Sequence, residues 1–189
     1  ALENMQYPAA TDALRKAVGK TKGPQKLGVI TSLGVKRDAK STRAIAKSLK
    51  DKDADVARAA AGALGRIGTV QSNTILAAFA KSAPAEWQNA VAEAQLTGAE
   101  MLVKDNKGNL AVPFLTALTT DEREFVRVGA LRGLAAAAPQ DAVALVSKTL
   151  VGSDPVAANF AAQIVAEYPG GDMTKPFAAA YASLPPAAQ

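Results

Sequence analysis

The chain has 189 residues, of which 49% are hydrophobic and only 5% are aromatic. It contains no cysteine and no histidine, which excludes disulfides, thiol nucleophiles, imidazole bases and the zinc sites built from these ligands. Residues 1–81 carry 15 basic and 6 acidic side chains, whereas residues 82–189 carry 7 basic and 11 acidic ones. The formal net charge of the whole chain is +5. This asymmetry can attract an anionic partner to the N-terminal half, or the lysines can simply solvate outer helices.

A recurring pattern of small and apolar residues predicts the fold. Its late apolar anchors, separated by 31, 32, 38 and 30 residues, are Leu33, Leu64, Leu96, Leu134 and Ile164. A stripe through Trp87, Val91, Ala94 and Gly98 fits the third copy equally well. Because self-similarity of this period is typical of solenoids, we expect an all-α, right-handed α-α superhelix. It is predicted as a single array over residues 1–189, with about five helical hairpins at approximately residues 7–38, 39–70, 71–108, 109–138 and 139–170.

Local signals place the helices within each copy. The inner helix of the second copy repeats Val56, Ala60 and Leu64 on one face, and Ser41 is expected to cap its outer partner. Further outer helices are expected at residues 74–81, 113–118 and 141–150, and a capping helix at residues 174–184. Residues 104–109 are interpreted as an inserted surface loop. Inner helices are expected to begin at prolines, namely Pro24, Pro84 and Pro155. Helices are expected to end at glycines, namely Gly34, Gly65 and Gly68.

The best copy, residues 53–69, resembles the inner helix of HEAT repeats, with its aspartate, valine, alanine run and final Leu-Gly-x-Ile-Gly. Val126 and Arg127 keep the family order of valine followed by arginine, whereas Ala57 follows Val56. The resemblance implies that Asp55 and Arg127 belong to a ladder of bonds between neighbouring repeats. It covers essentially the whole chain and marks architecture more than activity.

The start of the sequence suggests a segment of a longer protein. The chain opens without an initiating methionine, and residues 1–5 resemble the tail of an inner helix from a preceding repeat. The opening and residues 27–34 are also similar to HEAT segments of large exported bacterial proteins. By that resemblance alone, a periplasmic or extracellular location is expected. No membrane span is expected, since no run of 18 or more apolar residues occurs.

Several potential sites have simpler structural interpretations. Residues 104–109 lack the alternating oxygen ligands of a calcium loop, and the glycines of residues 62–68 lack the strand and Gly-Lys-Ser/Thr of a phosphate loop. Asp121, Glu122 and Glu124 are expected to cap a helix, and Trp87 to be partly buried. No metal site and no cofactor is therefore predicted.

Two alternatives to a protein partner remain open at this stage. HEAT-like DNA glycosylases bind DNA along a basic face, using aromatic residues as well. Those aromatic residues are missing here. Basic residues do lie in or beside the predicted inner helices, and they are Lys22, Lys26, Lys36, Arg37, Arg58 and Arg66. The repeats also resemble HEAT-like phycobilin lyases, which is the less favoured alternative because aromatic residues are few and histidine and cysteine are absent.

The favoured interpretation is a non-catalytic scaffold that binds another protein, or spaces a neighbouring domain of the same polypeptide. The inner helices are predicted to form a shallow concave surface. Arg58, Arg66 and Arg132 are the candidate binding residues on it, because helical geometry directs them away from the apolar stripe.

Overall fold

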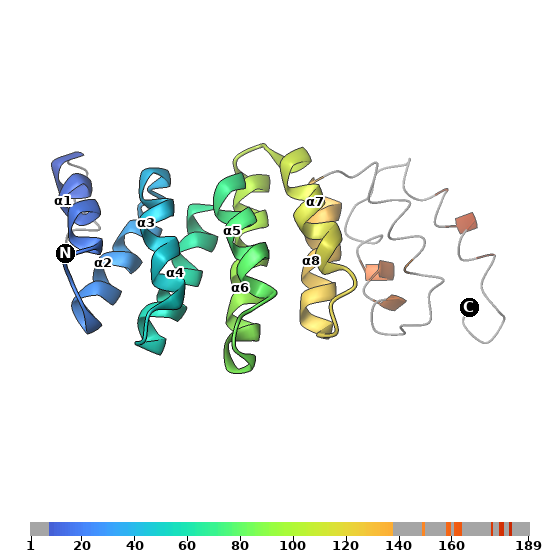
Figure 1. The fold of residues 1–189 in the computed structure, drawn as a ribbon. Helices are drawn as coiled ribbons and strands as arrows, with labels where there is room; N and C mark the ends of the chain where they lie inside the picture. Colours follow the sequence, from blue (N-terminus) through green and yellow to red (C-terminus); the bar gives the residue numbers. More distant parts are fainter. Residues whose placement is uncertain are drawn as a thin grey trace. The chain divides into compact units, whose positions relative to one another are not determined.

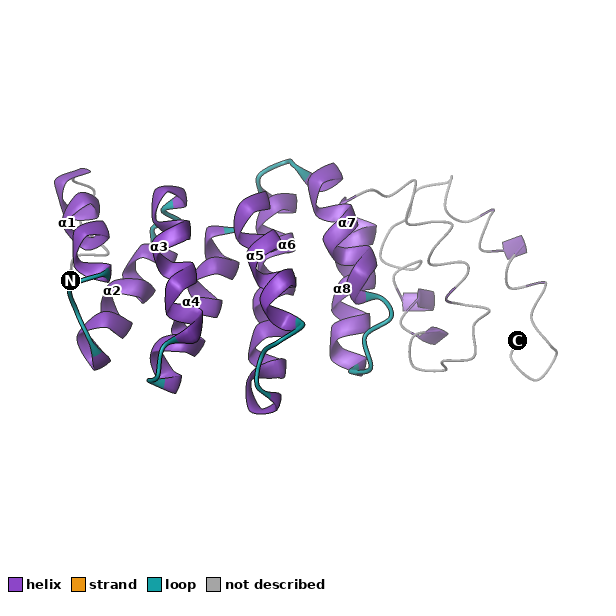
Figure 2. Cartoon of the chain, in the orientation of Figure 1, coloured by secondary structure: helices purple, strands orange, loops and turns teal. Residues whose placement is uncertain are grey.

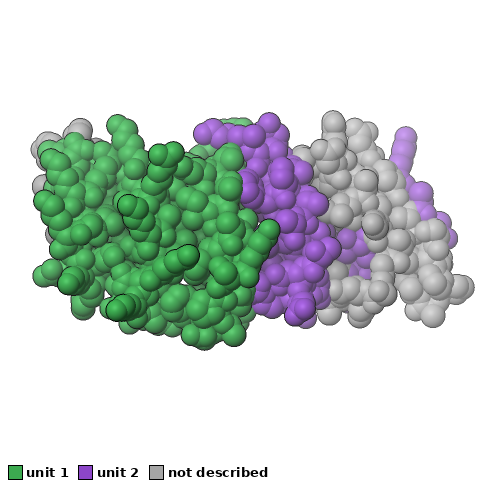
Figure 3. Space-filling model, in the orientation of Figure 1, with its two compact units in different colours: residues 1–106 green, residues 107–189 purple. Residues whose placement is uncertain are grey.

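The computed structural model describes residues 8–137 without interruption, together with residues 149, 158–159, 161–163, 175, 178–179 and 182. Within residues 8–137 every regular element is a helix and none is a strand (Figure 2). The all-α prediction is therefore confirmed for this part of the chain. By its contacts the chain divides into two compact units, residues 1–106 and residues 107–189 (Figure 3).

Short helices in chain order build both units (Figure 1). In unit 1 the described elements are α1 (Pro8–Val18), α2 (Gly23–Val35), η2 (Ala39–Ser41), α3 (Thr42–Lys47), η3 (Ser48–Lys50), α4 (Ala54–Ile67), α5 (Val70–Ala80), η4 (Ala85–Trp87) and α6 (Gln88–Lys104), where η marks a 3-10 helix. In unit 2 they are α7 (Gly108–Leu118) and α8 (Glu124–Ala137). The predicted fifth hairpin and capping helix, residues 139–170 and 174–184, lie outside the continuously described residues.

Two rows of helices form unit 1. In one row α2 packs on α4 and α4 packs on α6, and these are its most extensive helix contacts. In the other row α1, α3 and α5 each pack on the helix that follows, so that each pair is a helical hairpin. Unit 2 contains one described hairpin, in which α7 packs on α8.

Glycine allows the main chains of the first row to approach closely. A Cβ atom at Gly34 would lie 2.8 Å from Cα of Ala63, and one at Gly65 would lie 2.6 Å from the carbonyl oxygen of Ala94. The prediction that these two glycines end helices is wrong, because α2 continues to Val35 and α4 to Ile67. They are contact points between helices, where a side chain would force the backbones apart.

The buried faces of the inner helices follow a shared spacing. Val56, Val91 and Val126 lie 35 residues apart, and each is buried near the start of its helix. Along α6 the buried residues include Val91, Ala94 and Gly98, whereas Leu96 is only partly buried. The alternative stripe for the third copy is therefore the one that faces the core.

Helix boundaries depend on local turn chemistry. Gly68 ends α4 with φ of 62°, the left-handed conformation that glycine adopts without strain. Pro24 lies in the first turn of α2, as predicted. A capping box between Thr69 and Ser72 begins α5 four residues before the predicted start. That signal is visible in the sequence, in the threonine and the serine three residues later.

Two further boundaries differ from prediction. The outer helix expected to begin at Pro113 begins at Gly108 instead, with the proline inside α7. The predicted inserted loop is a short turn, because α6 ends at Lys104 and α7 begins at Gly108.

Ser41 precedes α3 but forms no capping bond with it, since its hydroxyl donates to the carbonyl oxygen of Asp38 instead.

Replacing Gly65 by alanine should lower the free energy of unfolding by about 1–3 kcal/mol, because its Cβ would overlap the Ala94 carbonyl. Gly62→Ala is the matched control, since the same helix leaves that Cβ with no neighbour within 4 Å. It should stabilise the chain by about 0.5–1 kcal/mol through helix propensity alone. Urea unfolding followed by circular dichroism measures both, and equal effects would contradict a close approach at Gly65.

Candidate interaction surface

The described residues hold no metal-ion cluster and no membrane-spanning element. No group of three or more His, Cys, Asp or Glu side chains among them is arranged to bind a metal. None of their helices is long and apolar enough to cross a bilayer. The interactions described below are hydrogen bonds and ion pairs of charged side chains, side-chain amides and main-chain groups.

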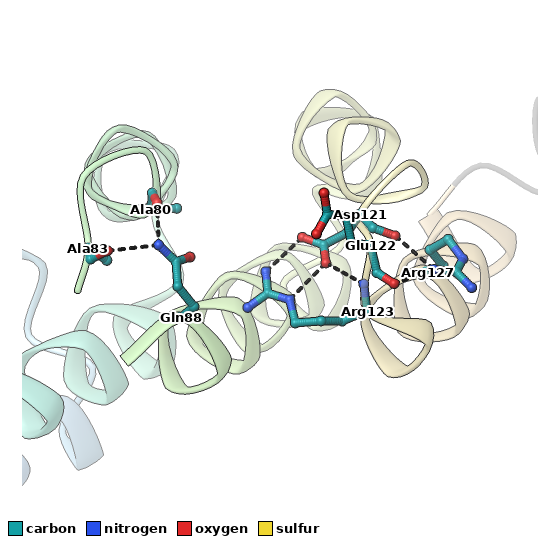
Figure 4. A network of polar contacts seen from close by, with 7 residues as sticks. All are labelled: Ala80, Ala83, Gln88, Asp121, Glu122, Arg123 and Arg127. Carbon is teal, nitrogen blue, oxygen red and sulfur yellow. Dashed lines mark hydrogen bonds and ion pairs between the residues drawn. The ribbon is translucent and has the colours of Figure 1, made fainter. Parts of the chain in front are cut away.

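Asp121 organises the turn before α8, and helix capping by Asp121, Glu122 and Glu124 stays a prediction. The Asp121 carboxylate accepts hydrogen bonds from the backbone N–H of Arg123 at 2.9 Å and from its Nε at 2.8 Å (Figure 4). Arg127 Nη1 donates to the carbonyl oxygens of Asp121 at 2.9 Å and Glu122 at 2.8 Å. These bonds connect the turn to the first residues of its own helix.

The turn that leads into α6 is held by Gln88 and Trp87. The Gln88 side chain donates to the carbonyl oxygens of Ala80 at 3.2 Å and Ala83 at 2.8 Å (Figure 4). Trp87 is partly buried and packs against the hydrophobic core, which confirms its predicted position. The indole is therefore a packing element of this turn.

The predicted binding arginines divide between the two units. Arg58 and Arg66 are exposed on α4, where Arg58 forms an ion pair with Asp55 in its own helix. Arg132 is exposed on α8, in unit 2. The structure thus places two of the three on one helix, and the three-residue site stays a prediction.

Three of the six basic residues considered for nucleic-acid binding have carboxylate partners. Lys26 Nζ lies 2.7 Å from Asp51 Oδ2, and Arg37 holds both carboxylate oxygens of Asp105 at 2.8 and 2.7 Å. Arg58 is paired with Asp55. Each pairing lowers the positive potential available to a phosphate backbone.

A second set of cations, not singled out from the sequence, lies on α3 and its 3-10 flanks. We call this set the α3 basic stripe: Lys40, Arg43, Lys47 and Lys50. All four are exposed, and the opposite face of the same segment is buried through Ser41, Thr42, Ile45, Ser48 and Leu49. The sequence signal was available, because the cations follow one another at intervals of three, four and three residues.

The α3 basic stripe is unfavourable for the isolated helix. Like charges three or four positions apart are neighbours on a helix surface and cost about 0.2–0.5 kcal/mol per pair. Residues 39–50 contain no acidic side chain that could offset this repulsion. None of the four cations forms an ion pair or hydrogen bond with any residue that the structure describes.

An open depression adjoins the start of the α3 basic stripe, between α1 and the turn that follows α2. Its lining includes two carboxylates and four cations, and consists of Thr11, Asp12, Arg15, Lys36, Arg37, Asp38, Ala39 and Lys40. Arg15 is held in place there, because its Nε donates to Asp38 at 2.7 Å and its other nitrogens reach Asp38 and Asp12. Arg37 adopts a left-handed backbone with φ of 50°, and its Nε is buried without a hydrogen-bond partner.

Comparison with known proteins agrees with this geometry. Residues 24–96 match the family model of HEAT repeats. This part of the chain is a HEAT-repeat segment. No curated protein sequence matches the chain at a significant level.

Solved structures share the HEAT-like fold. One is the complex of CpcE and CpcF of phycocyanin lyase from Nostoc sp. PCC7120, with a TM-score of 0.51 and 20% identity over 85% of this chain. The chain spans 65% of the length of that protein. An engineered protein is similar too, with a TM-score of 0.50 and 20% identity over 91% of this chain and 85% of its own.

Ion pairs between hairpins also involve residues other than those that the resemblance implied. Asp55 pairs within its own helix, and Arg127 donates to carbonyls of the turn before its own helix. Lys26 of α2 instead reaches Asp51 before α4, and Arg15 of α1 reaches Asp38 before α3. Asp38 and Asp51, both in turns, therefore link neighbouring hairpins.

These ion pairs lower the pKa values of their carboxyl groups. Hydrogen bonds from Arg15 hold the pKa of Asp38 below its ordinary value, although burial of the carboxyl partly opposes the effect. Lys26 and Arg123 likewise lower the pKa of Asp51 and of Asp121 through hydrogen bonds. Because each pKa is lower in the folded chain than in the unfolded one, these carboxylates stabilise the fold above about pH 4. The stabilisation is lost as the pH falls through the lowered values.

Replacing Asp38 by asparagine should lower the free energy of unfolding by about 1–3 kcal/mol at neutral pH, because it removes the buried anion that Arg15 binds. The loss should shrink as the pH falls below about 4, where the wild-type carboxyl first becomes protonated in the unfolded chain and, at lower pH, in the folded chain. Urea unfolding across pH 3 to 7 measures this, with about 0.5 kcal/mol or less expected for the exposed control Asp12→Asn. A loss independent of pH would show that packing, rather than charge, makes Asp38 important.

Proposed function

We propose that this chain is a non-catalytic scaffold that binds another protein or holds a neighbouring domain of the same polypeptide. The observation that supports it is the stacked HEAT-repeat row of unit 1, whose outward faces carry charged side chains above a continuous packed core. Helical repeats of this kind expose extended surfaces in proportion to the number of repeats, which suits contact with another macromolecule.

The charged faces differ from helix to helix, which gives such a surface specificity. The exposed face of α6 includes Glu93 and Glu100, whereas α3 presents only cations and α5 contains no charged residue. A charge that differs between helices supports recognition of a partner with complementary charge.

The lyase complex similar to this chain supports the fold alone at 20% identity. Its pairing of CpcE with CpcF is nevertheless an example of a protein-binding role for such a fold. The proposal therefore predicts no absorbance shift when the chain is mixed with a linear tetrapyrrole such as phycocyanobilin. A stoichiometric shift would favour the phycobilin-lyase alternative instead.

The scaffold proposal is tested with a partner identified by cross-linking and mass spectrometry in the organism of origin, and then purified. Replacing Arg58 and Arg66 with glutamate should weaken binding of an acidic partner by about tenfold or more, because reversed charges repel it. Isothermal titration calorimetry measures the affinity. The matched control reverses Lys20 and Lys81, two exposed turn residues of the same unit, and should bind like the wild type.

Two results would count against these assignments. Equal affinity of both variants for the partner would remove Arg58 and Arg66 from the interface. Absence of any cross-linked protein or domain at physiological salt would contradict the scaffold itself.

A further inference from the structure

We infer that the α3 basic stripe, the exposed side chains Lys40, Arg43, Lys47 and Lys50, is the docking site for an acidic segment of the partner protein. The inference rests on the proposed scaffold function and names one contact surface and the chemistry of its occupant. It adds a contact on α3 to the arginines of α4 that the sequence suggested.

The cations of the stripe form one line. They follow each other at about one helical turn, so the stripe extends about 15 Å along the segment of residues 39–50. The buried side chains Ile45 and Leu49 hold the opposite face against the core. Packing therefore fixes the backbone that carries the four cations, while their exposed charged groups can reach a ligand.

Among the described residues, the stripe lacks the carboxylate partners that four other cations of unit 1 have. Arg15, Lys26, Arg37 and Arg58 each have a carboxylate partner within the unit. The stripe has none among the described residues, and its members repel one another at helical spacing. An anionic ligand that bridged them would relieve this repulsion, whereas a solvating surface would gain from interspersed acidic residues.

The spacing of the stripe matches an acidic helix better than a nucleic acid. Glutamates or aspartates at intervals of three and four residues present one carboxylate per turn, which pairs with one cation per turn. Phosphate-backbone binding favours a broad basic surface, yet the depression beside Lys40 also presents the carboxylates of Asp12 and Asp38. The stripe also bears no exposed aromatic side chain on which bases could stack.

The test measures fluorescence anisotropy of a labelled oligo-glutamate peptide with the full chain at low salt. Replacing Arg43 and Lys47 with glutamate should weaken binding by about tenfold or more, and raising the salt should weaken wild-type binding. The variant is expected to fold, because it converts the repulsive neighbours Lys40 with Arg43 and Lys47 with Lys50 into opposite-charge pairs. A second variant, Lys40→Gln with Lys50→Gln, removes charge without reversing it and should show a smaller loss.

The control reverses Lys20 and Lys81, which changes the net charge of the chain equally and should leave peptide affinity within about twofold. If the wild type does not bind the peptide, or if control and stripe variants lose affinity alike, the assignment is overturned. Tighter binding of a DNA duplex than of the peptide at the same salt, lost in the stripe variant, would overturn the acidic-protein occupant. The scaffold proposal stands or falls separately, on whether cross-linking captures a partner protein or a neighbouring domain.

Discussion

The close approach of α2, α4 and α6 is the constraint on which unit 1 depends. At Gly34 and Gly65 the neighbouring main chains come so near that a single Cβ atom would overlap Ala63 or Ala94. Alanine and glycine supply little apolar area each, so the stability of this row comes from many short-range contacts between well-fitted backbones. This explains how a chain with 5% aromatic residues builds a continuous core.

Packing at this distance leaves charged side chains only at the turns and on the outward helix faces. At the turns, aspartates such as Asp38 and Asp51 accept cations from a neighbouring hairpin and join the repeats by polar contacts as well. On the outward faces the charges differ between helices, and α3 carries cations without carboxylate partners in the described part of the chain. These cations without carboxylate partners are the basis for proposing a contact surface.

Several elements could be predicted because their cause is local. The buried face of α4 follows from the spacing of Val56, Ala60 and Leu64, and the end of α4 follows from Gly68. The start of α5 also has a local cause, in Thr69 and Ser72, although spacing alone suggested a later residue. The role of Gly65 was not predictable in this way, since its neighbour Ala94 lies 29 positions away in the sequence.

The sequence by itself determined that the chain is helical, that its helices come in repeated pairs, and which face of most helices is apolar, because period and capping act over a few residues. Only the tertiary structure decided which cations are neutralised. Arg37 meets Asp105 across 68 positions of sequence, and Arg15 meets Asp38 across 23. Pairings of this kind depend on how the hairpins stack, and the stacking distance is set by contacts between residues that no local pattern connects.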